Sequence, residues 1–377
     1  MKRVSIYILA ILPLVISCSS GKNALERGDY FGAVERAVSR LRAKPSDEKA
    51  ATILKDSYAY LQKWVQDEMD IRLSQGTIFK WEDVVALQIR VNQISNEIRR
   101  SPAALRIIPE PKTFTSELKM AEEKAAEARY EQGIKLIGAN TRESAREALI
   151  HFERCNQLWP GYRDVKEKMV FARDHATIKV IIESIPVHSK TFQLTAGFFY
   201  DQVFEYMNDH FREKSFVRFF TLQEAEKMEI RYPDLVVRLE FFDFVVGDAV
   251  HHEVEQEVSR DVKIETKDTT KTEIKTYRAK LKTFTDKLIS GGILYVRITD
   301  FQASRLLFSD KIPGEFVWQN QYGIYVGDIQ ALNDTQQAIV SRKLITPPPP
   351  QTLFMEFTRP IFGQLTEKMA KFFREYN

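Results

Sequence analysis

The chain has 377 residues, a formal net charge of +3 at pH 7 and 44% hydrophobic residues. The nearly balanced charge excludes the strongly basic surface of a nucleic-acid-binding protein, so we expect no nucleic-acid partner. The hydrophobic content is that of a globular protein, and the length is sufficient for two domains.

An export signal occupies the N-terminus. A short positive start precedes an apolar run at positions 4–16, which is too short to span a bilayer as a helix. Ser17 then precedes Cys18, and this arrangement resembles the lipobox of bacterial lipoproteins. The resemblance implies that residues 1–17 are removed and that Cys18 carries a covalent lipid.

The lipid would place the protein on a membrane of the bacterial envelope. Ser19 follows the cysteine, and a serine at this position resembles the sorting signal for the outer membrane. We therefore expect a lipid-anchored outer-membrane protein that faces the periplasm. The inner membrane and the other face stay open as alternatives. Residues 18–22 would link the anchor to the folded chain, and no cofactor besides this lipid is expected.

Residues 23–174 are rich in helix-forming residues and poor in glycine, which predicts a helical domain. Two stretches share the spacing Ala-x3-Ala/Phe-x7-Pro: Ala33, Ala37 and Pro45, and then Ala148, Phe152 and Pro160. Small residues let two helices approach closely, and proline ends the second helix. The spacing resembles the tetratricopeptide repeat and implies an irregular solenoid that binds proteins. A generic helical bundle is the alternative.

The second cysteine, Cys155, lies in this helical part. If Cys18 is lipidated, no intramolecular disulfide can form. We expect Cys155 to behave as a buried apolar side chain.

Residues 175–345 change in character and predict an α+β domain. The expected elements are a strand at 177–187, a helix at 193–213, a strand at 216–220, a capped helix from Thr221 with Glu224 in its capping box, and a strand at 234–246. Gly291 and Gly292 are expected to form a turn.

Strict alternation from Val250 to Thr266 predicts a further strand, which turns at 267–270 and returns. A four-residue loop sets a register in which Glu255 faces Lys282 and Glu257 faces Lys280. We expect a long charged β-hairpin that projects beyond the core, with these four residues as its interaction surface. Exposed strand edges would also allow self-association.

A second hairpin is expected from strands at 293–300 and 305–312, ended by Pro313 and Gly314. The loop that follows carries the candidate binding residues Trp318, Tyr322 and Tyr325, because loop aromatics often serve recognition. Residues 346–377 form a proline spacer and a C-terminal amphipathic helix.

The order of elements over residues 177–312, with the phrases at 233–238 and 296–301, resembles a group of envelope domains. The group includes the amino-terminal domain of the Tol-Pal translocation protein, the curli-secretion lipoproteins and the lipoprotein activators of peptidoglycan synthases. The resemblance implies an α+β fold with a mixed or antiparallel sheet and a role in envelope assembly.

No catalytic motif is evident. His251 and His252 are neighbours on a predicted strand and therefore point to opposite faces, so they cannot share one metal ion. We expect a non-enzymatic scaffold or adaptor for envelope proteins. The alternatives are a subunit of an oligomeric secretion channel and a module that binds peptidoglycan or another glycan.

Overall fold

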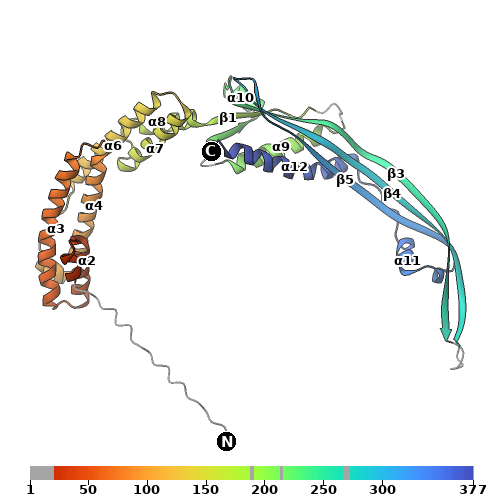
Figure 1. The fold of residues 1–377 in the computed structure, drawn as a ribbon, viewed down its shortest axis with the longest axis horizontal. Helices are drawn as coiled ribbons and strands as arrows, with labels where there is room; N and C mark the ends of the chain where they lie inside the picture. The colour runs from red at the N-terminus through yellow and green to blue at the C-terminus, as the bar shows by residue number, and fades with distance from the viewer. Residues whose placement is uncertain (1–20, 187–190, 213–214, 266–271, 377) are drawn as a thin grey trace, which may run out of the picture. The chain divides into compact units, whose positions relative to one another are not determined.

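The computed structural model describes residues 21–186, 191–212, 215–265 and 272–376. The predicted signal peptide, Cys18 and the turn at 267–270 lie outside the described residues. The chain is a mixed α+β protein that divides into two compact units between Ala176 and Thr177 (Figure 1). Among the described residues, no helix combines the length and apolar character needed to cross a membrane.

The first unit is helical. Its helices are α1 (Lys22–Glu26), α2 (Tyr30–Ala43), α3 (Glu48–Ser74), α4 (Lys80–Arg99), α5 (Pro102–Ile107), α6 (Ser116–Ile137), α7 (Arg142–Leu158) and α8 (Val165–Ala176). Side-chain caps begin several of them: Asp29 accepts a hydrogen bond from the Gly32 amide, and Asp47 accepts one from the Ala50 amide. Leu54, Leu61 and Ile98 are fully buried between helices.

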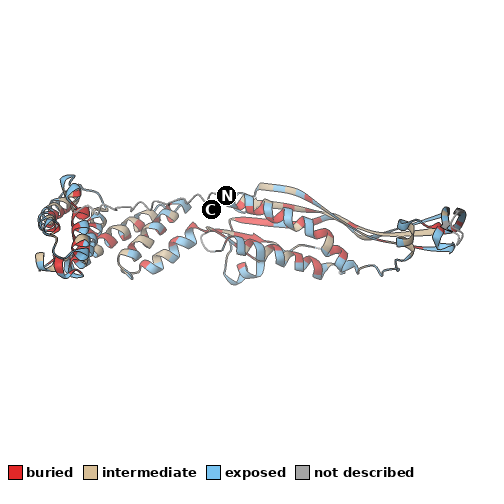
Figure 2. Ribbon diagram, turned by 90° about the horizontal axis from the view of Figure 1, so that it is seen from below, coloured by how far each residue is buried: buried red, intermediate tan, exposed pale blue. Residues whose placement is uncertain are grey.

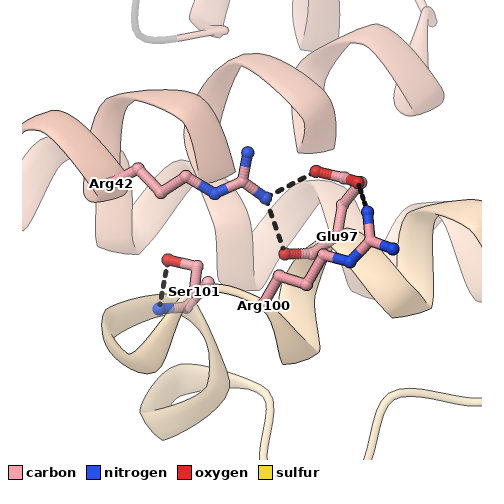
Figure 3. A network of polar contacts seen from close by, with 5 residues as sticks. Arg42, Glu97, Arg100 and Ser101 are labelled. Carbon is pink, nitrogen blue, oxygen red and sulfur yellow. Dashed lines mark hydrogen bonds and ion pairs between the residues drawn. The ribbon is translucent and has the colours of Figure 1, made fainter.

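A surface network links α2 to α4 (Figure 3). Arg42 donates hydrogen bonds to the side chain of Glu97, at 2.5 Å, and to its carbonyl oxygen, at 3.1 Å. Arg100 donates to the same carboxylate at 3.2 Å. The hydrogen bond from Arg42 is the main reason why the pKa of Glu97 lies below its ordinary value. Because these side chains are exposed, they contribute little to stability.

A second charged cluster is more buried. Glu82 on α4 accepts hydrogen bonds from Arg129 on α6 and from Arg154 on α7, the latter at 2.8 Å. Burial raises the pKa of Glu82, but the two arginines outweigh it and the net pKa lies below the ordinary value. His151 stacks on Phe79, with 5.4 Å between ring centroids. Burial and the charge of Arg129 lower the pKa of His151.

The second unit contains a five-stranded sheet in the order β2-β1-β3-β4-β5. The strands are β1 (Ile178–Ile182), β2 (Val217–Phe220), β3 (Leu235–Glu265), β4 (Thr272–Asp300) and β5 (Arg305–Gly327). Strand β1 is parallel to β2 and β3, and β3, β4 and β5 are antiparallel neighbours. The helical elements are α9 (Gln193–His210), α10 (Leu222–Lys227), η1 (Ile329–Ala331), α11 (Asp334–Val340) and α12 (Pro350–Arg374). The predicted capping box of Thr221 and Glu224 is confirmed at α10.

Alternating residues of the strands supply two layers. Val180 and Ile182 contribute to the core with α9 and α12, whereas Ile181 packs with α10 on the opposite face. Phe354 and Phe357 of α12 are fully buried in this core. Helices α9 and α12 lie together along the sheet (Figure 1), and buried and exposed residues alternate along them (Figure 2). The C-terminal helix is therefore part of the second unit rather than an appendage after a spacer.

The predicted turn at Gly291 and Gly292 is wrong, because both residues lie inside β4. A Cβ atom on Gly292 would lie 2.6 Å from the Cβ atom of Phe244 on β3. The predicted end of a strand at Pro313 and Gly314 is also wrong, because β5 continues to Gly327. The missing N–H of Pro313 is tolerated because β5 is an edge strand.

Two predicted strands, 234–246 and 250–266, are one strand, β3. Its pairing with β4 shifts between Phe241 and Asp243 and again between Val245 and Asp248, as in β-bulges. Gly247, at φ +72°, lies in the second bulge, and its amide donates a 3.0 Å hydrogen bond to the hydroxyl of buried Ser290. The bulges explain why the strict alternation of the sequence begins only at Val250, after the second bulge.

Strands β3, β4 and β5 extend past the part that α12 covers. One face of this extension is covered by η1 and α11, with Tyr277, Ala279 and Leu281 of β4 buried beneath them. Gly323 of β5 lies against Ile339 of α11.

Candidate functional site

The opposite face of the same three strands is not covered by η1 and α11. Its residues form five rows across β3, β4 and β5, which we call the open face: Glu257–Lys280–Val326, Glu255–Lys282–Ile324, Glu253–Phe284–Tyr322, His251–Asp286–Asn320 and Ala249–Leu288–Trp318. Each row consists of directly paired residues, and successive rows are two residues apart, so all five rows point to one side.

The open face brings together two groups of residues that the sequence predicted separately. Of the seven predicted interaction residues, six lie on it: Glu255, Glu257, Lys280, Lys282, Trp318 and Tyr322. Tyr325 does not, because it pairs with Leu281 and points to the covered face. Trp318 and Tyr322 lie within β5 rather than in the predicted loop.

The distal rows carry charge on β3 and β4. The predicted register of Glu255 with Lys282 and of Glu257 with Lys280 is confirmed. Lys280 forms an ion pair with Glu257 at 3.4 Å, whereas Lys282 pairs diagonally with Glu253 at 2.5 Å. The hydrogen bond with Glu253 is the main cause of the raised pKa of Lys282. The carboxylate of Glu255 is thus left without an ion pair in the described part of the chain.

On β5 the distal rows end in exposed aliphatic side chains. Ile324 is 56% exposed and Val326 is 77% exposed. In the next row, Phe284 and Tyr322 stack with 5.0 Å between ring centroids. Over the two distal rows, the open face therefore has an acidic column on β3, a basic column on β4 and an apolar column on β5.

In the described part of these strands, two of the hollows concern the open face. The distal hollow, about 550 Å³, is lined by Glu257, Ser259, Arg278, Lys280 and Val326, among others. The proximal hollow, about 390 Å³, lies between the open face and residues 344–347, a segment between α11 and α12 that we call the strap. Leu288 and Trp318 line the proximal hollow together with Leu344 and Ile345 of the strap.

A polar row crosses the strands at the proximal hollow. The Nδ1 atom of His251 lies 2.5 Å from an Oδ atom of Asp286, and both residues line the hollow. Asn320 pairs with Asp286 on the other side and is only 5% exposed. Its Nδ2 atom has no hydrogen-bond partner among the described residues.

Sequence reasoning missed Asp286 and Asn320. The register inferred from Glu255 and Lys282, continued by four residues, already places His251 opposite Asp286. No comparable signal identified Asn320, since β5 was not expected to continue beside β4. His252 pairs with Thr285 and points away from His251, as predicted. Within the described ranges, no group of three or more His, Cys, Asp or Glu side chains has a metal-binding arrangement.

Comparisons with known proteins identify no family. No family model matches the sequence, and no curated protein matches it either. Solved structures with some similarity include that of a neuraminyllactose-binding hemagglutinin homologue from Helicobacter pylori. It has a TM-score of 0.27 and 12% sequence identity, over 53% of this chain and 89% of that chain. At this TM-score the likeness carries no argument about fold or function.

Proposed function

We propose that this protein is a lipid-anchored, non-enzymatic adaptor of the bacterial envelope. Cys18 would hold it on the outer membrane, on the side that faces the periplasm. The helical unit would bind one protein and the open face of the second unit would bind another. The observation that carries the proposal is the open face itself, on which exposed aliphatic side chains run beside two charged columns.

Exposed aliphatic residues on a folded surface favour recognition of a partner when they are grouped. Ile324 and Val326 follow each other along one column and lie beside Lys282 and Lys280. A partner that covers this column would bury apolar area and meet charges of both signs at its rim. Such a combination of an apolar strip with a polar border is typical of protein interfaces.

The charge pattern favours a different protein over a second copy. A two-fold axis parallel to the strands would place the β4 columns of two copies on each other, lysine against lysine. A two-fold axis across the strands would place every column on itself, including glutamate on glutamate. Like charges in contact are unfavourable, so a closed face-to-face dimer is disfavoured.

The helical unit is proposed to be a degenerate tetratricopeptide-like solenoid. In support, Ala33 and Ala37 are buried in α2, and Ala148 and Phe152 are buried in α7. Gly133 of α6 lies so close to Phe152 that an added Cβ atom would be 2.5 Å from its ring. We also propose that β3 and β4 form one long hairpin, and their antiparallel pairing from Leu235–Asp300 to Glu265–Thr272 supports this.

A photoreactive residue in place of Ile324 tests the binding surface in living cells. Gln256 provides the matched control, because it is exposed but lies on the other face of β3, in register with Leu281. We expect Ile324 to capture one defined envelope protein that Gln256 does not capture. Self-crosslinks in a ladder at Ile324 would favour the oligomeric channel instead, and equal capture from both positions would contradict the proposal.

The anchor is tested separately. Metabolic labelling with an alkyne-bearing fatty acid should modify the wild-type chain, and Cys18→Ala should abolish the labelling and release the protein from the membrane fraction. Cys155→Ala is the matched control and should be labelled like the wild type, because Cys155 is buried. Labelling that survives Cys18→Ala would contradict lipid attachment at this residue.

A further inference from the structure

We infer that the proximal hollow binds an uncharged saccharide, with one sugar ring stacked on Trp318 and its hydroxyl groups at His251 and Asp286. This site is distinct from the distal rows proposed for the protein partner. Its cavity of about 390 Å³ falls within the range of small-molecule sites, roughly 300–1,000 Å³.

The walls of the hollow suit a ring with apolar faces. Trp318 and Leu288 form the floor on β5 and β4, and Leu344 and Ile345 of the strap face them across the hollow. The two strap residues remain 67% and 59% exposed, so they do not close against the strands. An aromatic side chain provides a large flat apolar surface, which matches the C–H face of a sugar ring.

The polar row suits hydroxyl groups. A carboxylate accepts hydrogen bonds through both oxygens. One Asp286 oxygen is engaged by His251, and the other is not involved in that contact. Both residues line the hollow, whereas Asn320, which pairs with Asp286 in register, does not. A hydroxyl group of a sugar would supply a donor for the second Asp286 oxygen.

Asp286 and Lys287 both line the hollow, so it carries one acidic and one basic side chain, and this balance favours an uncharged ligand. Asp286 already lies in hydrogen-bond contact with the His251 ring, so a cationic ligand would compete with His251 for the same carboxylate. An anionic ligand would meet the carboxylate of Asp286 directly. A peptide would also present backbone N–H and C=O groups to the largely apolar walls, where they would lose their hydration. Hydroxyl groups on a ring carry no charge and can hydrogen-bond to Asp286, while the C–H face of the ring meets the apolar walls.

The test is ¹⁹F NMR of the full chain labelled with fluorotryptophan. The sequence has four tryptophans, and Trp318 is the one in the second unit, so Trp318→Phe identifies its resonance. Maltotriose, cellotriose and chitotriose are titrated as three neutral probes. We expect at least one of them to shift the Trp318 resonance saturably while the other three resonances stay in place.

Variants then locate the ligand. Asp286→Asn preserves shape and removes the charge, and it should weaken saccharide binding by about tenfold or more, because hydrogen bonds to charged groups are strong. Asp261→Asn is the matched control and should bind like the wild type, since Asp261 bonds Thr276 outside this hollow. Absence of a shift with all three sugars would overturn the inference, as would equal affinity of Asp286→Asn. A larger Trp318 shift with a neutral valine-rich peptide than with any sugar would overturn it in favour of a peptide groove.

Discussion

Alternate residues of one strand have opposite surroundings at the distal end of the sheet. On the covered face, Ala279 and Leu281 of β4 are buried under η1 and α11, whereas Lys280 and Lys282 between and beside them face the open side. The difference shows that, at the distal end, helices pack against only one face of the sheet. The other side therefore carries exposed charges and aliphatic groups without disturbing the core.

The other end of β4 has the reverse arrangement. Leu294, Val296 and Ile298 are fully buried against the α12 side, so the buried positions change from odd to even numbers along the strand. From residue 282 to residue 289 every side chain is half-buried. The polar row and the proximal hollow lie in this middle section, where neither cover is complete.

The largest expected loss of stability comes from a substitution at the end of the sheet that α12 covers. Phe357 is completely buried, and its ring lies 5.0 Å from that of Phe354. Phe357→Ala should lower the free energy of unfolding of the second unit by about 3–5 kcal/mol, because it leaves a large cavity. Urea unfolding followed by circular dichroism measures this. A loss below about 1 kcal/mol would mean that α12 is not central to the core.

The two faces of the distal end are compared by a matched pair of truncations. Leu281→Ala removes a fully buried side chain and should cost about 2–5 kcal/mol, whereas Ile324→Ala on the open face should change stability by less than about 0.5 kcal/mol. Hydrogen exchange of the β4 amides gives the local effect. Similar acceleration of exchange in both variants would remove the distinction between a covered and an open face.

A pH effect should separate the helical unit from the sheet unit. Because burial and Arg129 lower the pKa of His151 in the folded chain, the unfolded chain binds its proton more readily. The stability that neutral His151 contributes is therefore lost as the pH falls below about 6.5, the ordinary pKa of histidine.

Fluorescence reports this change in the helical unit, which holds Trp64, Trp81 and Trp159. His151→Gln should flatten the dependence of stability on pH just below about 6.5. Glu82 titrates at lower pH, because its pKa lies under the ordinary value for glutamate. An unchanged slope in His151→Gln would contradict the assignment to this residue.

The smallest change in stability is expected for a substitution in the charged distal rows of the open face. Lys282→Gln removes the ion pair with Glu253. The side chain of Lys282 is 35% exposed and that of Glu253 is 43% exposed. Such a pair contributes at most about 1 kcal/mol, and less at high salt. Chemical denaturation at low and high salt measures the difference. A salt-independent loss of several kcal/mol would show that these side chains hold the fold rather than a partner.

The sequence predicted those parts of the fold that follow a local rule. The capping box of Thr221 and Glu224 follows from two residues three positions apart. The pairing of Glu257 with Lys280 follows from a loop length and a period of two, although the loop itself lies outside the described residues. From this register the charged part of the open face could be predicted.

The remaining parts depend on contacts between distant segments. Gly292 and Gly314 look like turn residues, but they lie within strands, where the close approach of Phe244 and of the α12 backbone at Phe357 leaves no room for a Cβ atom. A strand that ends at Pro313 places Trp318 in a loop and leaves Asn320 without a role. The site at the middle section could not be predicted, since it needs the pairing of β5 with β4.

Accessibility in the cell tests most directly whether the open face is a binding surface. Cysteine is introduced by Ile324→Cys on the open face and by Gln256→Cys on the other face, and each is labelled with a maleimide in intact envelopes and after purification. Cys155 gives little background, because burial raises its pKa to about 11. We predict that the open-face position is protected in envelopes and reactive after purification, whereas the other position reacts in both. Equal labelling of the two positions in envelopes would contradict the account.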